Sequence, residues 1–196
     1  MNISATEIAK LRDKTGLPMM ECKKALVEAD GNEGQAVEIL KNKGFSKAAS
    51  KSEREVKSGY IDSYVHNGKI GVIVEVLTET DFVAKNADFR RFVHDLALQI
   101  ASAKPIYVSS EIIPAEDIKK MKAEYEAEVG ASGKSAEIAG KIVEGKIKKW
   151  QSEVCLLDQK YLRDEDKTVG ELLAETIAKI GENIVISRFI RYELGD

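Results

Sequence analysis

An Asn-Gly pair at residues 67 and 68 separates two strand-like segments, and no other feature restricts the fold of this chain as strongly. The segments span residues 60–66 and 69–77. Asn-Gly favours a two-residue type I′ turn, and the turn sets the register of the strands it joins. The expected pairs are Val65 with Ile70, Ser63 with Val72, and Ile61 with Val74. We therefore expect an antiparallel hairpin with one apolar face.

A helix is expected directly after the hairpin, over residues 82–103. Its apolar residues recur at helical spacing and predict a buried stripe, made of Phe89, Phe92, Val93, Leu96 and Ile100. Phe82 lies seven residues before Phe89, so one interpretation makes it the first member of that stripe. The other interpretation is that Phe82 projects beyond the end of the sheet. An exposed Phe forgoes roughly 1.5 to 3 kcal/mol of burial, so exposure would indicate a pocket in a partner.

We expect three short helices over residues 1–45. Residues 46–58 are expected to form a linker, either helical or irregular. The start and stop signals are Ser4 with Glu7, Gly16, Pro18, Asn32 with Gln35, and Gly44. Helices this short are unstable alone, so we expect them to pack as a bundle. Met19 and Met20 follow Pro18. At helical spacing one should join the bundle core while the other points elsewhere, and methionine is common both in cores and at adaptable binding surfaces.

Residues 59–196 are expected to form an α+β core, in which a small antiparallel sheet packs with helices. A helical hairpin is predicted at about 115–129 and 136–157, and a last helix over about 168–180. A strand is predicted over residues 183–194. Because apolar residues occur at both parities in it, we expect this strand to be central in the sheet or covered on both faces.

Composition and cysteine usage restrict the class of protein. A net charge of −3 gives no general attraction to nucleic acid or anionic membranes. No apolar run approaches the roughly 18 residues of a membrane span, and no targeting segment is evident, so we expect a cytoplasmic protein. Cys22 and Cys155 lack C-x-x-C spacing, and we expect buried or inert thiols in a reducing compartment.

Neither a catalytic set nor a metal site is evident. His66 and His94 have no Ser or Cys partner at a spacing that suggests a triad, and no His, Cys and Asp cluster has ligand spacing. We therefore expect no enzymatic activity, cofactor or metal. Residues 164–166 are interpreted as a solvated charge run in a loop. Residues 130–135 are interpreted as an ordinary turn, because Glu128 stands where a phosphate-binding loop needs glycine.

Three segments together carry a resemblance to a known family. They are Thr15-Gly16 with Met19-Met20, then Thr80-Asp81-Phe82-Val83-Ala84, and finally Ile180-Gly181-Glu182-Asn183-Ile184. From Ile8 to Leu194 the chain resembles bacterial translation elongation factor Ts, the guanine-nucleotide exchange factor for elongation factor Tu. Its N-terminal module resembles ubiquitin-associated domains.

The resemblance implies a mechanism without covalent chemistry. In that family, residues matching Asp81 and Phe82 enter the GTPase domain of elongation factor Tu, dislodge Mg²⁺ and loosen bound GDP, so the implied contact segment is Thr80, Asp81, Phe82 and Val83. The N-terminal module holds a separate helix of the same partner, which implies contacts by Lys10, Leu11, Arg12, Met19 and Met20. Longer members carry two core modules and a coiled coil. This chain resembles a short form, and its single core predicts a homodimer through the sheet.

Two other hypotheses remain open from the residues alone. One is an RNA-binding or ribosome-associated module that uses lysines at 47–57 and 141–149, with salt-dependent binding of single-stranded RNA as its signature. The acidic total charge argues against it. The other attaches a ubiquitin-like partner-binding module to an unrelated core. In that case deletion of residues 1–50 would have no effect on nucleotide exchange.

Overall fold

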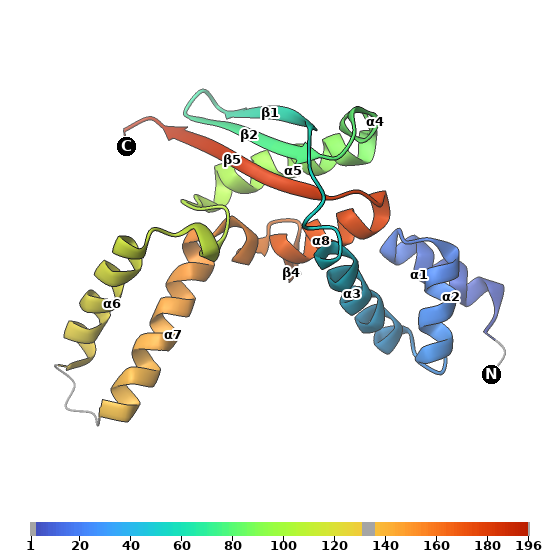
Figure 1. Ribbon diagram of the computed structural model, residues 1–196, viewed down its shortest axis with the longest axis horizontal. Coiled ribbons are helices and arrows are strands. Elements are labelled where there is room, and N and C mark those ends of the chain that lie inside the picture. The colour runs from blue at the N-terminus through green and yellow to red at the C-terminus, as the bar shows by residue number, and fades with distance from the viewer. Residues whose placement is uncertain (1–2, 131–135, 196) are drawn as a thin grey trace. The chain divides into compact units, whose positions relative to one another are not determined.

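The computed structural model describes residues 3–130 and 136–195 and has an α+β fold (Figure 1). Contacts divide the chain into two compact units. The first contains Met1–Asp62, Glu75–Asp95 and Glu171–Ser187, and the second contains Ser63–Val74, Leu96–Gly170 and Arg188–Asp196. Within the described ranges, none of the helices combines the length and the apolar character that crossing a membrane requires.

Three helices begin the chain: α1 (Ala5–Thr15), α2 (Met19–Glu28) and α3 (Glu33–Ala49). Three of their predicted end signals are confirmed. Ser4 and Glu7 form the capping box, Gly16 ends α1 in the left-handed region at φ 68°, and Asn32 caps α3 by accepting from the backbone N–H of Gln35. These local signals fix where the helices begin because each satisfies backbone groups that a helix end leaves unpaired.

The expected end of α3 at Gly44 is wrong, since the helix continues to Ala49 and takes in the start of the predicted linker. Gly44 is buried against the last helix of the chain, α8 (Val169–Ile180). A Cβ atom at Gly44 would lie 3.9 Å from both the Ala174 carbonyl oxygen and the Ala178 Cβ. Glycine here allows one helix to approach another instead of ending its own.

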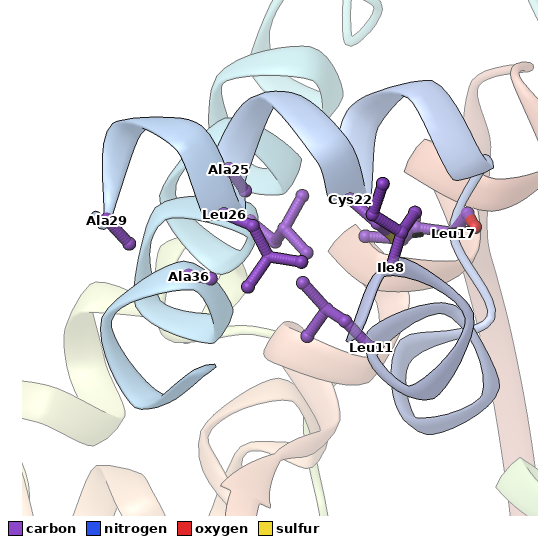
Figure 2. Close-up of a cluster of buried hydrophobic side chains, with 9 residues drawn as sticks. Ile8, Leu11, Leu17, Cys22, Ala25, Leu26, Ala29 and Ala36 are labelled. Carbon is purple, nitrogen blue, oxygen red and sulfur yellow. Dashed lines mark hydrogen bonds between the residues drawn. The ribbon is translucent and has the colours of Figure 1, made fainter. Parts of the chain in front are cut away.

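The three helices enclose a shared apolar core (Figure 2). Its members are Ile8, Leu11, Leu17, Cys22, Ala25, Leu26, Ala29, Ala36 and Leu40. Ala178 of α8 packs against this cluster. Burial of each large member contributes roughly 1.5 to 3 kcal/mol, which stabilises helices that would not persist alone.

The main sheet contains β1 (Ser58–His66), β2 (Ile70–Thr78) and β5 (Ile184–Glu193), in the order β1-β2-β5. The central strand is therefore β2, and the expectation that the last strand is central is wrong. Its apolar residues occur at both parities because several are exposed, among them Val185, Ile190 and Tyr192.

The turn of the hairpin has the predicted type I′ geometry. Asn67 and Gly68 both have positive φ, 51° and 68°, and the Lys69 N–H donates to the His66 carbonyl over 2.9 Å. The predicted apolar face is wrong for β1, in which the alternate positions 60, 62 and 64 are the half-buried ones. Val72 and Val74 are buried in β2, whereas Ile61 and Val65 of β1 are exposed.

Polar and aromatic side chains of β1 are the half-buried ones, because α5 (Ala87–Ala103) provides partners for them. The Arg90 guanidinium lies 4.9 Å from the centre of the Tyr60 ring, and His94 Nδ1 lies 2.9 Å from Asp62 Oδ2. Tyr60 and Asp62 therefore face α5 because of polar and cation–π contacts, which a hydrophobic pattern in the sequence does not predict.

Gly59 marks a close approach between β1 and β2. A Cβ atom at this position would lie 2.5 Å from the Val76 carbonyl oxygen and 3.1 Å from the Leu77 Cα. Such distances are far inside van der Waals contact, so any side chain here would force the strands apart.

The predicted single helix over 82–103 is in fact two helices, α4 (Asp81–Ala84) and α5. Asn86 restarts the chain, because its Oδ1 accepts from the backbone N–H groups of Asp88 at 2.7 Å and Phe89 at 3.4 Å. Asparagine favours this N-cap role over a place inside a helix. The predicted stripe of α5 is confirmed, since Phe89, Phe92, Val93, Leu96 and Ile100 are all buried.

The predicted helical hairpin is confirmed. It consists of α6 (Ala115–Gly130) and α7 (Ala136–Val154), which pack against each other (Figure 1). The short helices η1 (Ser110–Ile112) and η2 (Leu156–Asp158) lie on either side of it in sequence. Most of the predicted turn at 130–135 lies outside the described residues.

A second small sheet pairs β3 (Lys160–Tyr161) with β4 (Asp164–Thr168), so the expectation of a loop at 164–166 is wrong. Gln99 supports the partner strand β3 and the turn that follows it. Its buried amide donates to the Lys160 carbonyl over 3.0 Å and accepts from the Leu162 N–H over 2.8 Å. Tertiary contacts of this kind override a local sequence that favours a loop.

Candidate partner-binding site

The four-residue helix α4 presents Phe82 to solvent. The Phe82 side chain is 84% exposed, more than any other large apolar side chain in the described part of the chain, whereas the next residue, Val83, is 5% exposed. Ala84 is also buried. Val83 and Ala84 thus anchor the short helix while the Phe82 ring projects from it. The interpretation that places Phe82 in the buried stripe is wrong.

Thr80 caps this helix. Its backbone is extended, with φ −127° and ψ 152°, and its Oγ1 accepts from the Val83 N–H over 3.4 Å. The Ala84 N–H donates to the Thr80 carbonyl over 3.2 Å. Asp81 is exposed beside Phe82 and pairs with Lys85 one turn later. The predicted contact segment therefore consists of three exposed residues, Thr80, Asp81 and Phe82, followed by the buried Val83.

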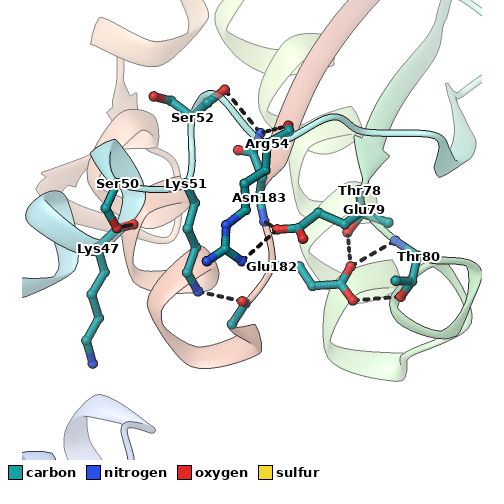
Figure 3. A network of polar contacts seen from close by, with 11 residues as sticks. Lys47, Ser50, Lys51, Ser52, Arg54, Thr78, Glu79, Thr80, Glu182 and Asn183 are labelled. Atoms are coloured by element: carbon teal, nitrogen blue, oxygen red, sulfur yellow. Dashed lines mark hydrogen bonds and ion pairs between the residues drawn. The ribbon is translucent and has the colours of Figure 1, made fainter.

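Glu182, in the loop between α8 and β5, lies beside the cap and accepts hydrogen bonds from it (Figure 3). Its Oε2 accepts from the Thr78 hydroxyl at 2.9 Å and from the Thr80 N–H at 3.0 Å, and its Oε1 accepts from the Thr80 hydroxyl at 2.6 Å. Glu182 belongs to the segment that carries the family resemblance, but spacing in the sequence gives no sign that it contacts Thr80.

Asn183 extends this network to residues 50–57, the irregular part of the predicted linker. Its buried amide donates to the carbonyl of Arg54 at 2.9 Å and to that of Ser52 at 3.4 Å. Its own N–H donates to Glu79 Oε1 at 2.6 Å, and Glu79 also pairs with the Arg54 guanidinium at 3.4 Å. Lys51 donates to the Gly181 carbonyl, and partial burial lowers the pKa of Lys51.

A second exposed apolar area lies on α2. Met19 and Met20 are both exposed, Met20 by 62%, so the expectation that one of them joins the bundle core is wrong. Leu17 and Cys22 occupy the neighbouring core positions instead. Val27 is also exposed and lies seven residues after Met20, a spacing that places the two on one helical face. Val27 was not among the predicted contact residues, although this spacing signals it.

The three predicted contact residues of α1 differ in exposure. Lys10 and Arg12 are exposed, whereas Leu11 is fully buried in the bundle core and is unavailable for direct contact in this conformation. Lys10 Nζ lies 2.7 Å from Glu33 Oε2. This hydrogen bond raises the pKa of Lys10 and, together with Lys14, lowers the pKa of Glu33.

The two histidines form hydrogen bonds within the fold, and the two cysteines are buried. His66 Nδ1 lies 2.9 Å from the Tyr64 hydroxyl in the hairpin, and His94 pairs with Asp62. Among the described residues, no group of three or more His, Cys, Asp or Glu side chains has an arrangement suited to a metal ion. Cys22 and Cys155 are buried free thiols, as predicted, and burial raises the pKa of Cys155 to about 11.

Comparison with known proteins places this chain in a family. The family model described as elongation factor TS matches residues 36–196. A protein named elongation factor Ts from Acetivibrio thermocellus is 49% identical over 195 residues, which cover 99% of this chain and 91% of the relative. A protein named elongation factor Ts from Alkaliphilus oremlandii is 50% identical over 196 residues, which cover 100% of this chain and 91% of the relative. The protein of the same name from Thermoanaerobacter pseudethanolicus is 48% identical over 195 residues, which cover 99% of this chain and 96% of the relative.

Proposed function

Since this chain belongs to the elongation factor Ts family, we propose that it promotes GDP release from elongation factor Tu by inserting Phe82 into that GTPase. Elongation factor Ts is a nucleotide-exchange factor of protein synthesis and not an enzyme in the usual sense. The observation that carries the proposal is the 84% exposure of Phe82 on an otherwise anchored helix. A ring held in water forgoes roughly 1.5 to 3 kcal/mol, which burial in a partner recovers.

The proposed mechanism is reciprocal destabilisation of two ligands on one partner. If this chain and GDP each weaken the affinity of elongation factor Tu for the other, the coupling free energy is the same in both directions. Phosphate binding depends strongly on the charge of the bound Mg²⁺, so displacement of that ion is an efficient way to loosen GDP. Asp81 and Phe82 are the side chains exposed for this task, and Thr80 and Val83 hold them in place.

The UBA-like N-terminal module is proposed to hold a separate helix of elongation factor Tu. Exposed Met19, Met20 and Val27 support this role, because methionine adapts its shape to an apolar partner surface. Lys10 and Arg12 add positive charge to the module surface, and Leu11 supports it from the core. These contacts would take place in the cytoplasm, where translation elongation occurs.

We also propose that the chain forms a homodimer through the open face of its sheet. Ile190 and Tyr192 of β5 are exposed and point to the same face, because alternate residues of a strand do so. A second copy related by two-fold symmetry would cover these side chains with identical ones. The test is multi-angle light scattering at micromolar concentration. A monomer that retains full exchange activity would exclude the dimer, and Tyr192→Asp should shift a dimer toward monomer.

The RNA-binding hypothesis finds less support. Lysines in the two proposed segments lie beside carboxylates: Lys47 with Glu21, Lys57 with Glu55, Lys141 with Glu137, Lys146 with Glu128 and Lys149 with Glu153. Carboxylates this close offset the positive field that phosphate binding needs. Salt-dependent affinity for single-stranded RNA would favour this hypothesis over exchange.

The decisive experiment is stopped-flow release of fluorescent GDP from purified elongation factor Tu. We expect the full chain to accelerate release and Phe82→Ala to accelerate it much less while still binding through the N-terminal module. A matched control is Ile106→Ala, which removes another exposed apolar side chain far from α4 in sequence. If Phe82→Ala performs as well as Ile106→Ala, the proposed role of Phe82 is wrong. Deletion of residues 1–50 tests the module, because unchanged exchange would favour the unrelated-core hypothesis.

A further inference from the structure

The Glu182 carboxylate accepts three hydrogen bonds from the residues that lead into α4 (Figure 3). Two come from Thr80, whose hydroxyl lies at 2.6 Å and whose backbone N–H lies at 3.0 Å, and one comes from the Thr78 hydroxyl at 2.9 Å. Thr78 is fully buried. Hydrogen bonds to an ionised acceptor are about twice as strong as neutral ones, so these contacts fix the strand end firmly.

The direction of the Thr80 hydroxyl follows from this contact. A threonine hydroxyl carries one proton and two lone pairs, whereas a carboxylate only accepts. Thr80 must therefore donate to Glu182, and this leaves its lone pairs free to accept from the Val83 N–H at 3.4 Å. Glu182 thus holds the Thr80 hydroxyl in an orientation in which it caps α4.

Glu79, between Thr78 and Thr80, is held by Asn183, the residue after Glu182. Glu79 Oε1 accepts from the Asn183 N–H at 2.6 Å, so residues 78, 79 and 80 are all tied to Glu182 and Asn183. A four-residue helix has little stability of its own. With the Phe82 ring in solvent, the orientation of α4 depends on this cap, on the burial of Val83 and Ala84, and on the Arg90 side chain, which donates to the Ala84 carbonyl over 3.1 Å.

We infer that Glu182 is a positioning residue for Phe82: it orders the base of α4 so that the exposed ring is held in a defined direction before a partner arrives. A preordered contact residue avoids the conformational entropy cost of ordering during binding. The inference rests on the proposed exchange function and extends it to a residue about one hundred positions away in the chain. It predicts that loss of Glu182 disorders α4 locally and reduces exchange through Phe82 alone.

The first test uses the free protein and needs no partner. Amide hydrogen exchange by NMR should show the N–H groups of residues 83–85 exchanging at least about tenfold faster in Glu182→Ala, since a bond to a charged acceptor is worth about that factor in an equilibrium constant. Amides of residues 91–100 in α5 should be unchanged. Glu182→Gln, which keeps one carbonyl acceptor, should give an intermediate rate.

Asp62→Ala is the matched control, because it also removes a carboxylate that holds another element, through His94 at 2.9 Å. It should leave residues 83–85 unaffected. Unchanged exchange at residues 83–85 in Glu182→Ala would overturn the inference. So would an equal increase throughout α5, because that pattern indicates general loosening and not positioning.

The second test is a double-mutant cycle on GDP release from elongation factor Tu. Glu182→Ala should lower the maximal rate by about tenfold in the full chain, yet by less than about twofold when Phe82 is already Ala, because the two residues act as one unit. Equal effects in both backgrounds would show that Glu182 acts elsewhere and would overturn the inference. If Phe82→Ala alone leaves release unchanged, the proposed exchange role fails, while hydrogen exchange still decides whether Glu182 positions α4.

Discussion

Phe82 and Phe89 differ completely in exposure, although they are seven residues apart. The Phe82 ring is 84% exposed and Phe89 is fully buried. One continuous helix would place them on the same side, because seven residues make about two turns. The break at Asn86 uncouples them, so α5 packs into the core without taking Phe82 with it.

This difference predicts opposite effects on stability. Phe82→Ala should change the free energy of unfolding by less than about 0.5 kcal/mol, as expected for a surface position. Phe89→Ala should lower it by about 3 to 5 kcal/mol, because it leaves a cavity in the core. Urea denaturation of both variants measures the two values. A large loss for Phe82→Ala would mean that the ring is buried in solution.

Local signals account for the parts of the fold that were predicted correctly. The Asn67-Gly68 turn and the caps at Ser4 and Asn32 each satisfy backbone groups within a few residues, so a short stretch of sequence determines them. The stripe of α5 and the helical hairpin were predicted from periodicity, which reports the buried face of a helix directly.

The incorrect predictions depend on contacts between distant residues. Glycine commonly ends a helix, and only the closeness of Ala178 shows that Gly44 is a packing site instead. Residues 164–166 form a strand through pairing with β3, which Gln99 supports. The contact between Glu182 and Thr80 joins residues about one hundred positions apart, and nothing local announces it. Asn86 does carry a local signal, because asparagine is one of the preferred N-cap residues.

A second prediction separates surface from core in the N-terminal module. Met20→Ala should leave stability almost unchanged, because the side chain is 62% exposed, and should weaken binding to elongation factor Tu more than it slows exchange in the bound state. Leu11→Ala should instead cost about 2 to 5 kcal/mol of stability. Calorimetric binding and saturating exchange rates distinguish the effects. A loss of maximal rate without loss of affinity would contradict the role of Met20.

A third prediction concerns the ion pair between α5 and α8. Lys179 Nζ lies 2.9 Å from Asp88 Oδ2, and this hydrogen bond lowers the pKa of Asp88 below its usual value of 3.8. Because the folded-state pKa is the lower one, the stabilisation is present above the unfolded value and is lost as the pH falls through the folded value. The pair is about half exposed, so its contribution should be below about 1 kcal/mol.

The comparison of the wild-type chain with Asp88→Asn tests this dependence. The difference in their free energies of unfolding should be present at neutral pH and should vanish once the pH is below the lowered pKa of Asp88. High salt should also reduce it, since ions screen exposed pairs. A difference that does not vary with pH would mean that Asp88 acts through packing or helix capping instead.

A fourth prediction concerns Cys155. The thiol is buried and burial raises its pKa to about 11, so the reactive thiolate is scarce at neutral pH. Iodoacetamide should label Cys155 in the unfolded protein and leave it unlabelled in the native one over the same period. Peptide mass spectrometry measures the extent at each cysteine. Rapid labelling of the native chain at neutral pH would show that this region opens readily.

The approach of Gly59 to β2 determines which substitutions this protein tolerates. A side chain at residue 59 would push on the carbonyl of Val76, only two residues before Thr78, where Glu182 binds. In a saturation mutagenesis library, position 59 should therefore be among the least permissive in the chain. Selection for exchange activity would then remove variants at Gly59, although glycine has no side chain that could contact a partner.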